Sequence, residues 1–362
     1  MRERLPIYLG IFGVMALSNA IVPVLPAFAG GPALQSAIYS AYFLGAFLTV
    51  IPGGLLSDRW GRIPVIRAGL LITVASGILI LAERDPFLVL AARGLEGLGA
   101  GLFVASAMSW MNSRPDHEYI SGEFMATLNL GLLLGLLGSG IIVQALGDGR
   151  AGILAFTLIS IVPAALALFV REAAQGKGPT MVRPGLAGGA FWVYLSAVIL
   201  VGATGAVTAL YPAYTGRNPE SLGIIIASMN LATIIAVIAA SRLHLPPILT
   251  IRTASLLLAA AVLIVPFTPA GFTLVGALLG FIMIAQLAYL AGTNLSQGKV
   301  MGSYNAASYA GMTLLPFVSG VVAEMGGFLA AFALVACLVA FMAPVIGLSG
   351  DGHVPARVLR NP

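Results

Sequence analysis

Long apolar runs, each ended by a short polar turn, repeat along the whole chain. Most runs are about twenty residues long, and hydrophobic and polar positions do not alternate within them. A helix of that length crosses the hydrocarbon core of a bilayer and satisfies its own backbone hydrogen bonds there. The pattern therefore predicts an all-α membrane protein with twelve transmembrane helices. The expected spans are residues 5–28, 34–56, 64–82, 87–111, 121–145, 151–170, 190–213, 221–241, 247–266, 271–292, 303–324 and 328–348.

The composition agrees with a lipid environment. Of the 362 residues, 59% are hydrophobic and 9% are charged, so the charged side chains are too few to cover the apolar surface of a soluble protein. The net charge is +5, but the basic residues are scattered through short loops and form no patch. They therefore indicate membrane topology, and we expect a monomer in contact with membrane lipid and not with nucleic acid.

Basic residues divide unequally between the two sides that twelve spans define. With the N-terminus in the cytoplasm, 14 of the 18 Lys and Arg residues lie on the cytoplasmic side, three lie on the other side, and Arg93 lies within a span. Cytoplasmic loops of membrane proteins carry an excess of Lys and Arg. The distribution predicts an integral protein of the plasma membrane with both termini in the cytoplasm.

The chain divides into two halves of six spans. The longest connection is rich in Gly and Pro, which predicts a cytoplasmic linker at 173–189 between helix bundles at 1–172 and 190–362. At an offset of 176 residues, the matching positions in spans five and eleven are Gly122, Met125, Asn129 and Gly135 with Gly298, Met301, Asn305 and Gly311. Farther along, residues 139–142 match 319–322 at an offset of 180, which implies a four-residue insertion of about one helical turn. Two parallel halves are a known plan of transporters.

A short charged loop joins spans two and three. Residues 54–62 read Gly-Leu-Leu-Ser-Asp-Arg-Trp-Gly-Arg, in which Asp58 and Arg62 can pair if the helix continues, and Gly61 allows the chain to reverse. This loop resembles the loop 2–3 signature of the major facilitator superfamily, Gly-x-Leu-x-Asp-Arg-x-Gly-Arg. The matching positions are Gly54, Leu56, Asp58, Arg59, Gly61 and Arg62, whereas Ile63 stands where a second basic residue is usual.

The resemblance covers the whole chain and implies the fold of the superfamily, which is two pseudo-symmetric six-helix bundles. It also implies that the loop is a conformational latch made of Gly54, Asp58, Arg59, Gly61 and Arg62. In such a latch Asp58 meets the N-terminal end of span eleven, where the helix dipole favours negative charge, and holds the cytoplasmic side closed in the outward-open state. The alternative is that these charges only set the membrane topology.

Two charged residues lie deep within span four. Arg93 and Glu96 are three residues apart, hence on one face of a helix, and ionisable groups within a membrane indicate a functional site. Burial disfavours an ionised carboxyl group and a neighbouring Arg favours it, so relative movement of the two can bind and release a proton. The segment also resembles the superfamily's motif Arg-x-x-Gln-Gly-x-Gly-Ala, with Glu96 in place of Gln. The alternative is a static pair that braces the helix.

Uncharged polar and aromatic residues recur at helical spacing within several spans. Polar groups in membrane helices face the bundle interior or a water-filled cavity. We therefore expect a substrate cavity lined by Asn19, Tyr39, Asn129, Asn230, Gln286, Tyr289, Asn305 and Tyr309. Hydrogen bonding between helices is the alternative for each of these residues.

Together these features predict a secondary active transporter that works by alternating access, and not an enzyme. We expect efflux of a small amphipathic or hydrophobic organic compound, as in the superfamily's drug/proton antiporters. The proton is the expected coupling ion, and no metal or other cofactor is expected. Span five keeps Gly131, Gly135 and Gly138 of the antiporter motif, but Leu136 replaces its proline and weakens the antiporter interpretation. The alternative is a proton symporter or a uniporter of a small metabolite such as an organic acid or a sugar.

Overall fold

The computed structural model describes residues 4–114, 116–170, 191–243, 245–292 and 297–347, and these residues form twelve α-helices and one 3-10 segment with no strand. The predicted linker at 173–189 lies outside the described residues. The first group of helices is α1 (Leu5–Ala20), α2 (Pro32–Trp60), α3 (Arg62–Ala82), α4 (Pro86–Asn112), α5 (His117–Leu146) and α6 (Ala151–Ala167). The second group is α7 (Phe191–Thr215), α8 (Pro219–Arg242), α9 (Pro247–Ile264), α10 (Ala270–Ala291), α11 (Gln297–Gly326) and α12 (Phe328–Val345).

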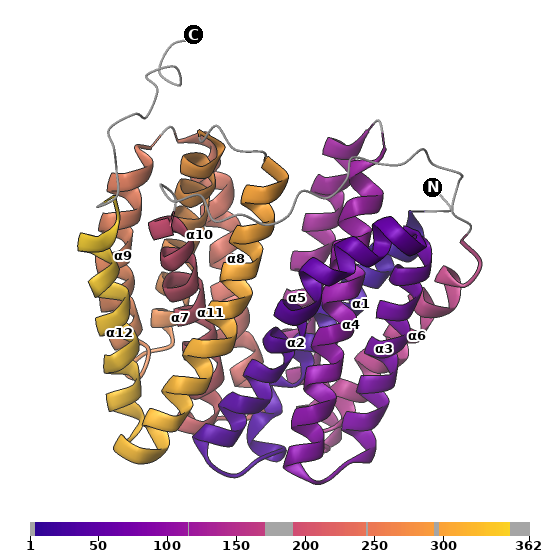
Figure 1. Ribbon diagram of the computed structural model, residues 1–362. Coiled ribbons are helices and arrows are strands. Elements are labelled where there is room, and N and C mark those ends of the chain that lie inside the picture. Colours follow the sequence, from indigo (N-terminus) through magenta and orange to yellow (C-terminus); the bar gives the residue numbers. More distant parts are fainter. Residues whose placement is uncertain (1–3, 115, 171–190, 244, 293–296, 348–362) are drawn as a thin grey trace.

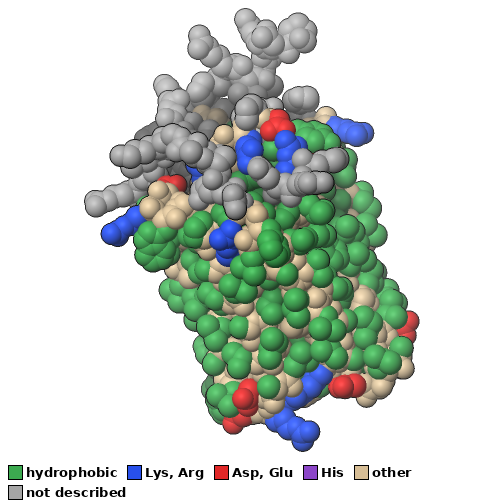
Figure 2. All heavy atoms as spheres, turned by 90° about the vertical axis from the view of Figure 1, so that its right-hand side faces the viewer, with side chains coloured by type: hydrophobic (Ala, Val, Ile, Leu, Met, Phe, Trp, Pro, Cys, Tyr) green, Lys and Arg blue, Asp and Glu red, His purple; other side chains and the backbone are tan. Residues whose placement is uncertain are grey.

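Within the described residues, the helices confirm the predicted all-α membrane fold with twelve helices. Ten of them are long and apolar enough to cross a membrane, and α1 and α6 are shorter apolar helices of 16 and 17 residues. Figure 2 shows the same property on the surface, where hydrophobic side chains cover the flank and the Lys, Arg, Asp and Glu side chains gather near its two ends. A flank of this kind needs lipid and not water around it.

The first span differs from its predicted limits. We expected one helix over 5–28, but α1 ends at Ala20 and residues Val22–Ala27 form the 3-10 segment η1. Pro23 and Pro26 lie in η1 and have no N–H to donate to an α-helical hydrogen bond. The two prolines therefore account for the change of helix type within the predicted span.

The helices form two bundles, α1–α6 and α7–α12, which Figure 1 shows side by side. The bundles meet mainly through α2 against α11 and through α5 against α8. We call the end at which Arg4 and Val345 lie the terminal end, and the opposite end the distal end. In Figure 1 the bundles lie together at the distal end, at the bottom, and diverge toward the terminal end.

Close contacts between the bundles lie toward the distal end. A Cβ added at Gly320 of α11 would lie 2.9 Å from the carbonyl oxygen of Pro32, at the start of α2. A Cβ at Gly140 of α5 would lie 2.5 Å from the carbonyl oxygen of Pro219, at the start of α8. These glycines allow the two helix pairs to touch backbone to backbone, which is a common way of packing membrane helices.

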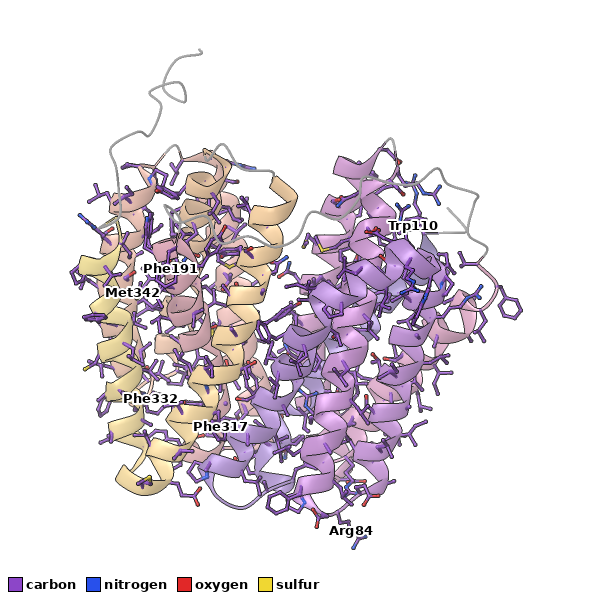
Figure 3. The ribbon with its side chains drawn as sticks, viewed as in Figure 1. Arg84, Trp110, Phe191, Phe317, Phe332 and Met342 are labelled. Carbon is purple, nitrogen blue, oxygen red and sulfur yellow. The ribbon has the colours of Figure 1, made fainter. Side chains whose placement is uncertain are left out.

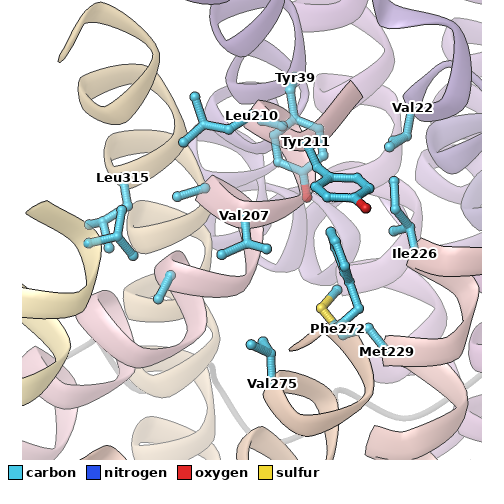
Figure 4. Close-up of a cluster of buried hydrophobic side chains, with 14 of the residues drawn as sticks. Val22, Tyr39, Val207, Leu210, Tyr211, Ile226, Met229, Phe272, Val275 and Leu315 are labelled. Atoms are coloured by element: carbon cyan, nitrogen blue, oxygen red, sulfur yellow. The ribbon is translucent and has the colours of Figure 1, made fainter. Parts of the chain in front are cut away.

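A cluster of buried hydrophobic side chains also joins the bundles in this region. Figure 4 shows Tyr39 of α2 beside Tyr211 of α7, and Val22 of η1 and Val207 of α7 belong to the same buried cluster. The ring of Tyr211 packs edge-on against Phe272 of α10, with 4.7 Å between ring centroids. The distal half of the interface is therefore packed like a protein core.

The internal repeat is present, but its predicted offset is partly wrong. Helices α5 and α11 are each continuous over 30 residues, and their first and last residues differ by 180 in number, so there is no place for a four-residue insertion. Gly131 packs against the backbone of α1, and Gly311 packs against the backbone of α7, the corresponding first helix of the second bundle. The matches at an offset of 176 are therefore displaced by one helical turn from the structural correspondence.

Candidate functional site

Arg93 and Glu96 form a buried ion pair on α4. Arg93 Nη1 lies 2.6 Å from Glu96 Oε2, and the side chains are 1% and 0% exposed. Arg93 also donates from Nη2 to the carbonyl oxygen of Ser18 on α1, at 3.2 Å. Its guanidinium group lies 4.9 Å from the ring centroid of Tyr42 on α2. The predicted pair therefore exists, and it lies where α1, α2 and α4 meet.

Glycines bring α2 and α4 close enough to enclose this pair. A Cβ added at Gly97 would overlap the carbonyl oxygen of Tyr42, and one added at Gly45 would overlap the carbonyl oxygen of Gly94. Only residues without side chains allow the two backbones to approach so closely. The pair is consequently sealed from solvent by backbone contact on one side of α4.

Both members of the pair keep a polar atom without a hydrogen-bond partner among the described residues. These atoms are Arg93 Nε and Glu96 Oε1, and both are buried. A buried charge is stable only when it is paired, so the two side chains depend on each other. If Glu96 binds a proton, Arg93 keeps the Ser18 carbonyl and the face of the Tyr42 ring as partners. The site can therefore hold a proton without leaving the cation alone.

Four of the predicted cavity residues have structural partners. Asn19 donates to the carbonyl oxygen of Leu132 at 3.0 Å and links α1 to α5, and Asn129 donates to the carbonyl oxygen of Met125 within α5 at 2.8 Å. The ring of Tyr289 packs edge-on against that of Trp192, with 4.7 Å between centroids. The fourth residue, Gln286, takes part in a network that links three helices.

Gln286 is fully buried at the centre of that network. Its Nε2 donates to Ser196 Oγ of α7 at 2.8 Å, and its Oε1 accepts from the hydroxyl of Tyr304 on α11 at 2.9 Å. Hydrogen bonding between helices therefore describes this side chain better than a substrate contact does. Ser196 and Tyr304 were not among the predicted site residues, because a partner on another helix leaves no local signal in the sequence.

The other four predicted cavity residues lie along the surfaces that the bundles turn toward each other. Tyr39 is buried on α2, and the ring of Tyr309 on α11 lies 6.4 Å from that of Phe43 across the interface. Asn230 and Asn305 are half-buried and make no hydrogen bond with any described residue. Asn230 follows Gly223 by seven residues on α8, so it shares the face that packs against α5. Asn230, Asn305 and Tyr309 are thus half-buried at this interface, whereas Tyr39 is buried.

The charged loop between α2 and α3 forms a tight turn. Gly61 has φ 94°, a conformation that favours glycine, and it separates the end of α2 at Trp60 from the start of α3 at Arg62. The helix therefore does not continue, and the predicted helical pairing of Asp58 with Arg62 is wrong. Arg62 is buried and donates from Nε to Ser109 Oγ of α4 at 3.1 Å.

The remaining residues of the predicted latch lie around this turn. Asp58 and Arg59 are exposed, and Gly54 is buried. Asp58 makes no ion pair or hydrogen bond with any described residue. The loop lies at the terminal end, where the bundles diverge, so the structure shows the loop without the contact that a closed latch would make.

Sequence comparison now identifies the family. Residues 7–295 match the profile described as Major Facilitator Superfamily. The chain belongs to this superfamily. Its members are transporters of small molecules, and the described helices make this one an integral membrane protein.

Curated relatives within the superfamily match a limited segment. The uncharacterized MFS-type transporter YwfA of Bacillus subtilis is 29% identical over 147 residues, which cover 37% of this chain and 35% of YwfA. The quinolone resistance protein NorB of Staphylococcus aureus is 27% identical over 134 residues, which cover 36% of this chain and 27% of NorB. The matched segments thus span about a third of the length of these relatives.

Solved structures of superfamily members resemble the whole fold. The human organic anion transporter MFSD10 (TETRAN) superposes with a TM-score of 0.67 at 16% identity, covering 95% of this chain and 99% of that one. The nucleoside transporter NupG superposes with a TM-score of 0.75 at 12% identity, covering 96% and 100%. At these identities the likeness concerns the fold alone.

Proposed function

We propose that this superfamily member is a proton-coupled secondary transporter that exports a small amphipathic or hydrophobic organic compound. The observation that carries the proposal is the buried Arg93–Glu96 pair on α4. Among the described residues, Glu96 is the one buried carboxyl group. An ionisable residue inside the membrane is costly to bury and therefore indicates a functional site. Proton binding at Glu96 exchanges one neutral arrangement, the ion pair, for a protonated acid beside a cation.

Coupling follows from the contacts that Arg93 makes across helices. Ser18 on α1 and Tyr42 on α2 both contact the guanidinium group, so its position depends on how α1, α2 and α4 are packed. A change in that packing alters the distance between Arg93 and Glu96 and thereby the affinity of Glu96 for a proton. In turn, the protonation state of Glu96 favours one packing arrangement over another.

The cargo is inferred from the uncharged surfaces between the bundles. Asn230, Asn305 and Tyr309 offer hydrogen bonds and aromatic contact without charge. Such a surface suits a compound with an apolar body and a few polar groups. The similarity to a quinolone resistance protein over about a third of the chain supports efflux.

The transport cycle follows from the arrangement of the bundles. We place both termini in the cytoplasm of a plasma-membrane protein, so that the terminal end faces inward and the present arrangement, with its closed distal end, corresponds to an inward-facing state. Asp58 and Arg62 would close the terminal end in the opposite state, with Gly54, Arg59 and Gly61 shaping the latch. This assignment is consistent with an exposed Asp58 in the present state.

The test is transport by purified protein in liposomes of defined orientation, with a fluorescent quinolone as the probe. We expect uptake to follow an imposed proton gradient and to be lost in Glu96→Gln, while exchange of labelled for unlabelled compound continues. The matched control is Glu83→Gln, the same chemical change at a half-buried residue that follows α3, which we expect to transport like the unmodified protein.

Three results would contradict the proposal. Unchanged proton dependence in Glu96→Gln would separate the ion pair from coupling. Flux that is the same with and without the proton gradient would identify a uniporter. Movement of proton and compound in the same direction would identify a symporter, and a metabolite panel of organic acids and sugars would then replace the quinolone.

A further inference from the structure

An acidic side chain lies in the last turn of α11, at the distal end, where the dipole of its own helix is unfavourable for negative charge. Glu324 lies in the last turn of α11, which ends at Gly326. The C-terminal end of a helix carries partial negative charge, so a carboxylate there is unfavourable unless another group compensates for it. The compensation comes from the other bundle.

Glu324 caps the first turn of α2. Its Oε2 accepts a hydrogen bond from the backbone N–H of Ala33 at 3.0 Å. Helix α2 begins at Pro32, and its N-cap residue, Gly31, supplies no side-chain oxygen of its own. Free N–H groups and the positive end of the dipole at this helix start therefore receive their acceptor from α11.

The backbone around this contact is shaped to admit the carboxylate. Gly31 has φ 79°, and a Cβ added there would lie 3.0 Å from Glu324 Oε2. One turn earlier on α11, a Cβ added at Gly320 would lie 2.6 Å from Ser36 Oγ of α2. Glycines on both sides of the interface thus let α2 and α11 come together, and the carboxylate reaches Ala33 only while they are together.

We propose that Glu324 is a distal latch that holds the transporter closed at the distal end. The hydrogen bond joins the C-terminal bundle to the N-terminal bundle, so it must break before the distal end opens. Its formation stabilises the present state relative to the opposite one. The latch concerns the balance of the two states and rests on neither proton coupling nor the identity of the cargo.

The pseudo-equivalent interface between α5 and α8 provides an internal comparison. Gln144 precedes Glu324 by 180 residues, which is the structural offset between α5 and α11, and it is exposed without a hydrogen bond to a described residue. Helix α8 is instead capped by its own N-cap residue, because Asn218 Oδ1 accepts from the N–H of Ser221 at 2.9 Å. Within the described residues, a helix cap supplied by the other bundle is thus found at only one of the two interfaces.

The experiment measures the two states directly by double electron–electron resonance, in the full chain reconstituted into lipid nanodiscs without substrate or proton gradient. Spin labels are attached to cysteines in a Cys337→Ser background. The distal pair is Arg84→Cys with Ala270→Cys, and Figure 3 shows Arg84 at the distal tip of the first bundle. The terminal pair is Ser113→Cys with Ser241→Cys. All four positions are exposed.

We expect Glu324→Ala to increase the ratio of distal-open to distal-closed molecules by about twofold to thirtyfold, the range set by loss of a helix N-cap. Glu324→Gln keeps an acceptor oxygen without charge and is expected to give a smaller increase. Gln144→Ala is expected to leave the ratio unchanged. Because the terminal pair reports the opposite end, its short-distance population should rise as the distal pair opens.

The proposal is overturned if Glu324→Ala and Gln144→Ala give the same ratio as the unmodified protein, or if both shift it equally. If Glu324→Ala folds poorly, the test is made with Glu324→Gln instead. A ratio of distal-open to distal-closed molecules equal to that of the unmodified protein then also counts against the latch. These distance distributions do not depend on whether Glu96→Gln loses proton-coupled transport, or on whether the unmodified protein couples transport to protons at all. Failure of one proposal can therefore be distinguished from failure of the other.

Discussion

Replacement of Arg93 by Met tests the buried ion pair that Arg93 forms with Glu96. The substitution removes the ion pair at 2.6 Å, the hydrogen bond to the Ser18 carbonyl at 3.2 Å and the contact with the Tyr42 ring at 4.9 Å. It leaves Glu96, which is 0% exposed, without a partner. Removal of one member of a buried pair costs about 3–5 kcal/mol, because the remaining charge is buried and uncompensated. We expect Arg93→Met to lose about that much free energy of unfolding.

A double-mutant cycle separates this cost from simple loss of packing. Glu96→Leu and the double variant complete the cycle, and the double variant buries no unpaired charge. We expect the double variant to recover most of the stability, which gives a coupling free energy of about 2 kcal/mol or more between the two sites. The measurement is reversible unfolding of the purified protein in mixed micelles. Strictly additive effects would show that Arg93 and Glu96 do not stabilise each other and would refute the reasoning.

Two further substitutions test the packing around the site. Gly97→Ala places a methyl group on the carbonyl oxygen of Tyr42, so α2 and α4 must separate, and we expect a loss of about 1–3 kcal/mol in thermal-unfolding measurements; Gly94→Ala, whose Cβ would meet a single oxygen at 4.0 Å, is the matched control and should be neutral. Gln286→Leu leaves the buried Tyr304 hydroxyl without its acceptor, and we expect a loss of about 1–3 kcal/mol with no change in the proton dependence of transport. A selective loss of transport at unchanged stability would instead make Gln286 a substrate contact.

The fold could be predicted from the sequence because, within a bilayer, the backbone must satisfy its own hydrogen bonds. Each apolar run had to form a helix, so the number of helices could be read from hydropathy and turn residues alone. The limits were less certain where local chemistry competes with helix formation. Pro23 and Pro26 replaced the end of the first predicted span with a 3-10 segment, and Gly61 separated α2 from α3 at the predicted Asp58–Arg62 pair.

The site could be predicted only as far as a single helix extends. The spacing of Arg93 and Glu96 placed them on one face of α4, and the pair forms as that spacing requires. The partners on other helices had no such signal, because the Ser18 acceptor is a backbone carbonyl that any residue provides. Gln286 shows the same limit, because it was predicted as a substrate contact and instead bonds neighbouring helices. A polar residue inside a bundle looks the same in the sequence whether it binds a neighbouring helix or a substrate.

The two proposed latches are related by the antiparallel course of α2 and α11. Asp58 and Glu324 each lie two residues before the end of their helix, so the pair of helices carries one acid at each end of the interface. Glu324 reaches the start of α2 in the present state, while Asp58 is exposed at the end where the bundles diverge. Both contacts would exploit the same favourable meeting of a carboxylate with a helix N-terminus, worth about 0.3–2 kcal/mol. Contacts of similar and modest strength at opposite ends would keep the two proposed states close in free energy. A carrier requires that balance, because a much stronger latch at either end would hold it in one state.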